Sequence, residues 1–427
     1  MVSFEQKNSG YTTHYKVVVA ACLLMVVGAA GSSGLSYFIQ PVTAEFGFTR
    51  SAFTIYMSIV TFSALYTLPI IGKLIPKIGV RKLVLINGIV CPIGFVGLSF
   101  ANSLSLFYFW AAVIGLVLHI CTISAVVLIN TWFIEKRGML VGLAMAFTGV
   151  GGLVLGAIMP NFIAAYGWHM GYRLLAGIAF LCTIPSVLFL IKDTPQSVGL
   201  KPFGYEEADA SATGAGSDKK ALEGVPYGRA LKSITFFALY PGLMLLGMLS
   251  AVSSQFPAFL SGQELGTTEI SVLMMVFNVA MIAAKIILGY LDDKIGTITN
   301  LIISYAATIA GVFLLVNGTQ YIIIGLGFVC FSLGFATVSV YSALLTDRVF
   351  GQRNYSGIYG ITSTAMSVGN AIGAPLWAMS FDKTGSYNIA FYACGAAVVL
   401  AFLLFLYALN SGAKLQEEYK NVPNGAV

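Results

Sequence analysis

Charged residues are scarce in this chain: Lys, Arg, Asp and Glu together make up 9% of its 427 residues, whereas 58% are hydrophobic. A soluble domain carries about 25% charged residues, so this composition excludes a chain whose whole surface faces water. Apolar runs of more than about 18 residues recur along the sequence, and each is long enough to cross a bilayer. Lipid offers no hydrogen-bond partner to the backbone, so each run is predicted to be a helix.

Motifs for catalysis, metal binding and nucleotide binding are also missing from the sequence. All six cysteines lie in apolar runs, without the spacing of a metal or redox site, and are interpreted as small packing residues. No Walker motif indicates a primary pump, and no nucleophile–base arrangement indicates an enzyme. We therefore predict no enzymatic activity, no cofactor and no metal. The net charge of +6 comes with basic residues that flank apolar runs, which indicates a lipid bilayer rather than nucleic acid as partner.

Twelve membrane-spanning helices are predicted, so both chain termini lie on the same side of the membrane. If that side is the cytoplasm, nineteen of the 23 Lys and Arg residues fall in cytoplasmic segments and three fall outside. By the positive-inside rule, this predicts a multi-pass cell-membrane protein with both termini in the cytoplasm. The first apolar run is interpreted as a retained helix and not as a signal peptide. The predicted spans are about 16–40, 51–74, 83–101, 104–131, 139–165, 172–191, 233–260, 268–290, 300–317, 320–346, 356–381 and 387–410.

The longest polar stretch divides six of these helices from the other six. It contains "ADASATGAGSDKK", which is small and polar without an apolar period, and this pattern is typical of a flexible linker. The predicted organisation is a six-helix bundle over 1–192, a cytoplasmic linker over 193–232, a second six-helix bundle over 233–410 and a cytoplasmic tail over 411–427.

One short motif occurs twice, as "GKLIPKIGVRK" from Gly72 and as "GYLDDKIGTIT" from Gly289, 217 residues later. The same offset joins Phe133 to Phe350 and Gly152 to Gly369. One offset at three places predicts two homologous halves. Two six-helix halves are the architecture of a large class of transporters, whose substrate site lies between the halves near mid-membrane.

The repeated motif resembles the signature loop of the major facilitator superfamily, Gly-x-x-x-Asp-Lys/Arg-x-Gly-x-Lys/Arg-Lys/Arg. Pro76 replaces the acid in the first copy, and the second copy lacks the basic tail. The resemblance implies an all-α membrane protein with twelve transmembrane helices in two pseudo-symmetric six-helix bundles. It also implies roles in conformational gating for Gly72, Lys77, Gly79, Arg81, Gly289, Asp293, Lys294, Gly296 and the basic Arg137.

Three other segments resemble a narrower branch of that superfamily, the oxalate/formate antiporters and monocarboxylate porters. They are "TWFIEKRG" at 131–138, "FGQRNYSGIYG" at 350–360 and "FDKTGSYNIAF" at 381–391. This resemblance implies import or exchange of small organic anions.

Lys285 is the only charged residue predicted to lie well inside a span. A charge at that depth costs about 2.5–3.5 kcal/mol, which a bound carboxylate would offset. The alternative is a lysine that extends to the cytoplasmic surface. The branch resemblance implies a cation four residues before the signature glycine Gly289, usually an arginine, and Lys285 holds that place. Oxalate exchangers carry a second lysine where this chain has Thr362, and a single cation suits a monoanion better than a dianion.

Several polar side chains are further candidates for substrate contact. His119 is predicted either to bond a substrate or carry a proton, since its ordinary pKa lies near working pH, or to be a neutral histidine bonded within the bundle. The others face the alternative of hydrogen bonding between helices or aromatic packing. They are Ser33, Tyr37, Gln255, Tyr341 and Tyr359.

The sequence as a whole favours a secondary active transporter of a small organic anion, preferably a monocarboxylate, that works by alternating access through proton symport or anion exchange. No acid is predicted within a span, which leaves His119 or the substrate to carry any coupled proton. The expected partners are a small carboxylate, protons and the lipid bilayer, and the expected state is a monomer. The alternatives are an exporter of hydrophobic or drug-like compounds and a polytopic membrane enzyme or sensor.

Overall fold

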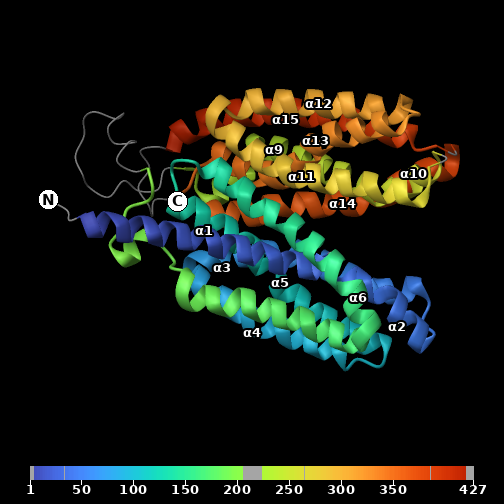
Figure 1. Cartoon of the computed structure of the whole chain (residues 1–427). Helices are drawn as coiled ribbons and strands as arrows, with labels where there is room; N and C mark the ends of the chain where they lie inside the picture. Colours follow the sequence, from blue (N-terminus) through green and yellow to red (C-terminus); the bar gives the residue numbers. More distant parts are fainter. Residues whose placement is uncertain (1–3, 33, 205–223, 264, 385, 420–427) are drawn as a thin grey trace. The chain divides into compact units, whose positions relative to one another are not determined.

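The computed structural model describes residues 4–32, 34–204, 224–263, 265–384 and 386–419. Long helices dominate this described part, which contains two isolated β-bridges and no named strand (Figure 1). The chain divides into two compact units. The first comprises Met1–Leu140 and Phe147–Gly214, and the second comprises Val141–Ala146 and Ala215–Val427.

The helices of the N-terminal half follow the predicted apolar runs and extend beyond several of them. The first predicted span corresponds to a helix, a short 3-10 helix and a second helix. The elements are α1 Phe4–Ser32, η1 Gly34–Phe38, α2 Ile39–Phe46, α3 Arg50–Ile78, α4 Val80–Ser99, α5 Leu104–Trp132, α6 Arg137–Pro185, η2 Ser186–Leu190 and η3 Pro195–Val198.

The C-terminal half begins with one short helix and continues with six predicted spans. Its first span is again divided, into α9, η4 and α10. The elements are α8 Tyr227–Lys232, α9 Ile234–Ala251, η4 Val252–Gln255, α10 Phe256–Ser261, α11 Thr267–Ile295, α12 Thr297–Asn317, α13 Tyr321–Phe350, α14 Tyr355–Thr384 and α15 Asn388–Tyr419.

Ten helical segments in the described part are long and apolar enough to cross a membrane. One of them, Arg137–Leu190, is interrupted at Gly167, whose φ of 80° is not helical, and therefore supplies two crossings. Helix α14, with 30 residues, is a further helix of membrane-spanning length. The chain is thus a helical membrane protein with the predicted major facilitator architecture, and its described residues supply the twelve crossings.

The two signature loops have the same backbone conformation. Gly79 joins α3 to α4 with φ 90° and ψ 153°, and Gly296 joins α11 to α12 with φ 81° and ψ 160°. Residues other than glycine rarely adopt this region of backbone conformation. The glycine at the eighth position of the motif is therefore required in both copies by the sharp turn between consecutive helices.

Small residues bring helices together in each half. A Cβ on Gly151 of α6 would lie 2.8 Å from the Cβ of Ala29 on α1. In the C-terminal half, a Cβ on Gly369 of α14 would overlap the carbonyl oxygen of Met244 on α9. Such contacts allow van der Waals packing between membrane helices, where the hydrophobic effect contributes little.

Two segments of the predicted linker are attached to the ends of long helices. Phe203 donates its N–H to the carbonyl oxygen of Trp132 at 2.9 Å and accepts the N–H of Ile134 at 2.9 Å. In the second unit, Val225 donates to the carbonyl oxygen of Phe350 at 2.8 Å. Residues 205–223, which include the "ADASATGAGSDKK" sequence, lie outside the described residues.

Candidate anion-binding site

Lys285 lies on α11 and is buried, with 6% of its surface exposed. Its Nζ donates to the carbonyl oxygen of Met145 at 3.3 Å. The α11 backbone at this level packs closely against Gly142. A Cβ added to Gly142 would overlap the carbonyl oxygen of Lys285 and lie 3.2 Å from Cα of Gly289. The ammonium group is thus enclosed by protein and is not extended to the surface.

Neighbours of Lys285 along the helix belong to an apolar cluster. On the same helix, Ala284 and Leu288 pack with Ala336 of α13 and with the partly buried Leu333. A cation among such side chains has lost most of its hydration, which makes its interaction with an anion much stronger than in water. The site is therefore chemically suited to a carboxylate.

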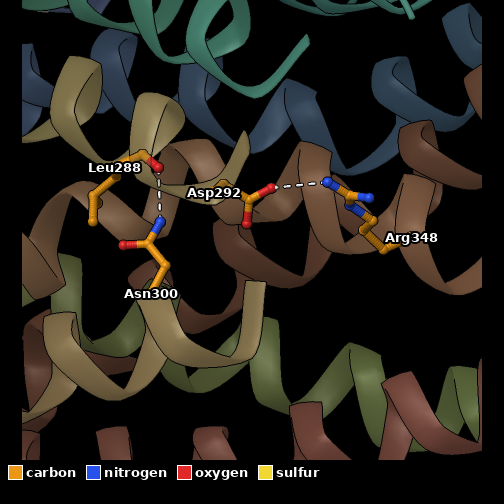
Figure 2. A network of polar contacts seen from close by, with 4 residues as sticks. All are labelled: Leu288, Asp292, Asn300 and Arg348. Carbon is orange, nitrogen blue, oxygen red and sulfur yellow. Dashed lines mark hydrogen bonds and ion pairs between the residues drawn. The ribbon is translucent and has the colours of Figure 1, made fainter. Parts of the chain in front are cut away.

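A buried carboxylate, which the sequence reasoning missed, lies two helical turns from Lys285. Asp292 is 1% exposed, and its Oδ2 lies 3.3 Å from Nη2 of Arg348 on α13 (Figure 2). Near it, Asn300 of α12 donates from Nδ2 to the carbonyl oxygen of Leu288 at 2.7 Å (Figure 2). The network therefore joins α11 to α12 and α13.

Asp292 corrects the prediction that no acid lies within a span. The apolar run was predicted to end near residue 290, whereas α11 continues to Ile295 and the candidate span is Thr268–Ile295. A spacing of seven residues is close to two full helical turns, so Asp292 lies on the same face as Lys285. That spacing is the signal by which the buried acid was identifiable from sequence.

The predicted contact residues of the second unit lie at different places and make different contacts. Tyr341 is fully buried, and its hydroxyl lies beside Asp292 and Asn300. Thr362 is also fully buried, and its Oγ1 lies 2.9 Å from Oγ1 of Thr346. Tyr359, buried on α14, stacks on Tyr355, and Gln255 accepts from the Tyr387 hydroxyl at 3.4 Å.

The first unit holds the remaining predicted contact residues. His119 is partly buried on α5, with Nε2 at 3.4 Å from the carbonyl oxygen of Val60. Tyr37 is also partly buried, and its hydroxyl would lie 3.0 Å from a Cβ on Gly156. Ser33 lies outside the described residues.

The predicted gating residues other than Arg137 lie in or near the two signature loops. In the second copy, Asp293 and Lys294 are exposed, Gly289 is buried, and Lys294 lies over the Tyr290 ring at 4.8 Å. In the first copy, Gly72 is buried, Lys77 is exposed and Gly79 is partly buried. Arg137 donates from Nε to the carbonyl oxygen of Phe133 at 2.9 Å.

Asp193 supplies a carboxylate to the first loop, where Pro76 replaces the signature acid. Its Oδ1 accepts the backbone N–H of Arg81 at 2.9 Å, and a Cβ on Gly79 would lie 2.9 Å from the same oxygen. Arg81 also donates from Nε to the carbonyl oxygen of Val187 at 3.0 Å. A carboxylate at the start of α4 satisfies a free backbone N–H and interacts favourably with the helix dipole.

The chain is similar to curated transporters along most of its length. It is 28% identical to human "Monocarboxylate transporter 2" over 412 residues, which cover 90% of this chain and 85% of the relative. It is 24% identical to rat "Monocarboxylate transporter 4" over 383 residues, which cover 87% and 78%. It is also 24% identical to "Uncharacterized MFS-type transporter YhjX" of Escherichia coli (strain K12), over 70% of this chain and 71% of that protein.

A solved structure shares the fold over most of the chain. The proton:xylose symporter XylE bound to 6-bromo-6-deoxy-D-glucose superposes with a TM-score of 0.74 over 94% of this chain and 96% of that chain, at 13% sequence identity. The family model described as "Major Facilitator Superfamily" matches residues 21–374. With the helical architecture and the two signature loops, this match confirms the predicted family: the chain is a transporter that belongs to the Major Facilitator Superfamily.

Proposed function

We propose that the chain is a secondary active transporter of a small monocarboxylate and that Lys285 binds the anion during alternating access. The observation that carries this proposal is the burial of Lys285, which is 6% exposed. A buried cation costs free energy unless an opposite charge is near, and a carboxylate substrate supplies one in the loaded state. The names of the monocarboxylate transporter relatives support the same substrate class.

The surroundings of Thr362 support a monoanion over a dianion. Thr362 stands where the oxalate exchangers carry their second lysine, and in this chain it faces the hydroxyl of Thr346. Two neutral hydroxyls do not balance a second negative charge. The charged Lys285 also disfavours the alternative of an exporter for hydrophobic or drug-like compounds, because such substrates do not neutralise it.

The other predicted binding and gating residues remain part of the proposal. We assign His119, Tyr37, Ser33, Gln255, Tyr341, Tyr359 and Thr362 to substrate contact. We assign the signature residues, with Arg137, to the conformational change. We also propose that the protein is a monomer and that both of its termini lie in the cytoplasm. Transport of the anion is coupled either to protons or to a counter-anion.

Counterflow in liposomes tests the substrate class. Purified protein in vesicles preloaded with unlabelled lactate is expected to accumulate external labelled lactate transiently, and pyruvate, formate or acetate in the vesicles is expected to support the same exchange. Oxalate in the vesicles is expected to support it poorly, because one interior cation does not balance two negative charges. Counterflow of a hydrophobic drug without counterflow of any monocarboxylate would establish the exporter instead.

The proposed orientation makes a separate prediction. In a variant without native cysteines, Arg229→Cys in the exposed part of α8 is expected to resist an impermeant thiol reagent in intact cells. Asn102→Cys, in the exposed connection between α4 and α5, is expected to react rapidly. The reverse pattern would invert the topology, since the two sites are predicted to lie on opposite sides of the membrane.

A further inference from the structure

We propose that Tyr56 of α3 is a positioning residue for the substrate, because its buried hydroxyl fixes the 3-10 turn η1 that presents Tyr37. This inference rests on the proposed function, in which Tyr37 contacts the substrate. Nothing in the sequence distinguishes Tyr56 from the other tyrosines. The structure brings its hydroxyl to the backbone of the first span, where that span changes from an α-helix to a 3-10 turn.

The first span of each half is interrupted by a 3-10 turn at an equivalent place. The turns are η1, Gly34–Phe38, and η4, Val252–Gln255. When the residues of η1 are moved by the 217-residue offset of the two signature motifs, they fall on 251–255 and coincide with η4. A 3-10 stretch inside a longer helix often marks a functional hinge. Each turn also carries one of the predicted substrate contacts, Tyr37 in η1 and Gln255 in η4.

A buried hydrogen bond connects Tyr56 to the backbone of η1. The Tyr56 hydroxyl donates to the carbonyl oxygen of Leu35 at 2.6 Å. A carbonyl oxygen only accepts, so the direction of this bond is fixed by the chemistry of the two groups. Both residues are buried, and a hydrogen bond that is shielded from water is stronger than one at a surface. The bond therefore restrains the backbone two residues before Tyr37.

The Tyr56 hydroxyl is itself held by a second buried tyrosine. Tyr172 of α6 donates its hydroxyl to the Tyr56 oxygen at 3.4 Å. Accepting this bond leaves the Tyr56 hydrogen directed at Leu35, and each bond in such a chain polarises the next. The Tyr172 ring also stacks on Phe38, with ring centroids 3.6 Å apart and an angle of 9° between the planes. The turn is thus restrained at Leu35 and at Phe38, on both sides of Tyr37.

A glycine on α6 makes room for the Tyr37 hydroxyl. A Cβ added to Gly156 would lie 3.0 Å from that oxygen, which is closer than side chains normally pack. The offset of 217 residues relates Gly156 to Gly373 on α14. A Cβ added to Gly373 would lie 3.0 Å from the Cβ of Ala251, the residue that precedes η4. Each half therefore sets the equivalent glycine against its interrupted span.

This arrangement prepares Tyr37 to donate a hydrogen bond. Tyr37 is partly buried, whereas Leu35 and Phe38 on either side of it are buried. A hydroxyl donates well to a carboxylate, and a donor that is already fixed in place loses little conformational freedom when the substrate binds. Without the Tyr56 hydroxyl, the backbone of η1 is less restrained. Tyr37 would then bind the anion less tightly, although Tyr56 itself does not contact the substrate.

Tyr56→Phe, which removes one oxygen and keeps the ring, tests the positioning role. In counterflow with labelled lactate, its KM is expected to rise on the order of tenfold, because a hydrogen bond to the carboxylate is weakened. The maximal rate is expected to stay near that of the wild type. Tyr108→Phe is the matched control, since the Tyr108 hydroxyl also donates to a backbone carbonyl of the same half, that of Ala52 at 2.5 Å, but not to η1. This control is expected to keep the KM of the wild type.

A double-mutant cycle shows whether Tyr56 acts through Tyr37. Tyr37→Phe is expected to raise the lactate KM, and adding Tyr56→Phe to it is expected to cause no further rise, because the positioned hydroxyl is already absent. A merely structural contribution of Tyr56 would raise the KM by the same factor in both backgrounds. Gly156→Ala is the second variant if Tyr56→Phe does not fold. Its methyl group displaces the Tyr37 hydroxyl from the other side, so the lactate KM is again expected to rise.

The possible outcomes separate this inference from the proposed function. A wild-type KM in Tyr56→Phe or in Gly156→Ala, an equal rise in Tyr108→Phe, or independent effects of Tyr56→Phe and Tyr37→Phe would overturn the positioning role and leave the monocarboxylate function intact. A wild type without counterflow of any monocarboxylate would overturn both proposals.

Discussion

Purified Lys285→Gln protein is expected to lose carboxylate binding while it still inserts and folds. Removal of one partner from a buried charge pair costs about 2–5 kcal/mol, so lactate affinity is expected to fall by at least about thirtyfold. Stability without ligand is expected to stay the same or rise, because a buried charge is removed. The measurement is the ligand-induced increase in melting temperature across lactate, pyruvate, formate, acetate and oxalate.

Two further variants separate charge from geometry at this position. Lys285→Arg keeps the positive charge and presents a planar fork of donors, so it is expected to retain partial binding with a changed order of substrates. Lys383→Gln removes an exposed lysine and is the control, with binding expected to equal that of the wild type. Wild-type lactate affinity in Lys285→Gln would show that this lysine does not bind the anion.

Substitution of Gly369 by alanine is expected to destabilise the C-terminal bundle strongly. The added methyl group would overlap the carbonyl oxygen of Met244, which belongs to the α9 backbone and has little freedom to move. Overpacking of this kind costs about 1–3 kcal/mol. The measurement is thermal unfolding of the purified protein in detergent, in which the melting temperature is expected to fall by several degrees.

Gly395→Ala is the matched control for this prediction. Gly395 is also within a long helix, α15, but a Cβ at this position meets nothing within 4 Å. Both substitutions share the gain in helix propensity, about 1 kcal/mol, so their difference isolates the overlap with α9. Equal melting temperatures for the two variants would show that α14 and α9 separate at little cost. The prediction that close packing at Gly369 excludes a methyl group would then be wrong.

The general architecture was predictable because lipid imposes it directly. Apolar runs must be helical, and the 217-residue offset between Gly72 and Gly289 exposed the duplication. The structure also explains why both copies of the motif have glycine at the eighth position. Gly79 and Gly296 share a backbone conformation that is essentially restricted to glycine, so the turn between the helices requires glycine at this position in both copies.

Helix ends were less predictable, because hydropathy marks the apolar part of a helix and not the helix itself. Helix α11 runs five residues past the predicted end of its span at 290, to Ile295, and α13 runs past 346 to Phe350. Those extra turns carry Asp292 and Arg348, which is why the buried ion pair was missed. Local composition there resembles a cytoplasmic loop, whereas packing against α12 and α13 buries the acid.

Contacts between distant segments had no local signal at all. Nothing around Asp193 indicates that it bonds the start of α4, more than a hundred residues earlier. The attachment of Phe203 to the end of α5 is likewise a backbone contact, which residue type does not specify. In contrast, Lys285 was identifiable from sequence, because a lone charge in an apolar run is conspicuous.

A structure of the protein with pyruvate is the measurement that tests the anion assignment most directly. We expect density for the carboxylate within hydrogen-bond distance of Lys285 Nζ, and the loss of that density in Lys285→Gln under the same conditions. Pyruvate bound elsewhere, with Lys285 still donating to the carbonyl oxygen of Met145 and making no contact with the ligand, would contradict it.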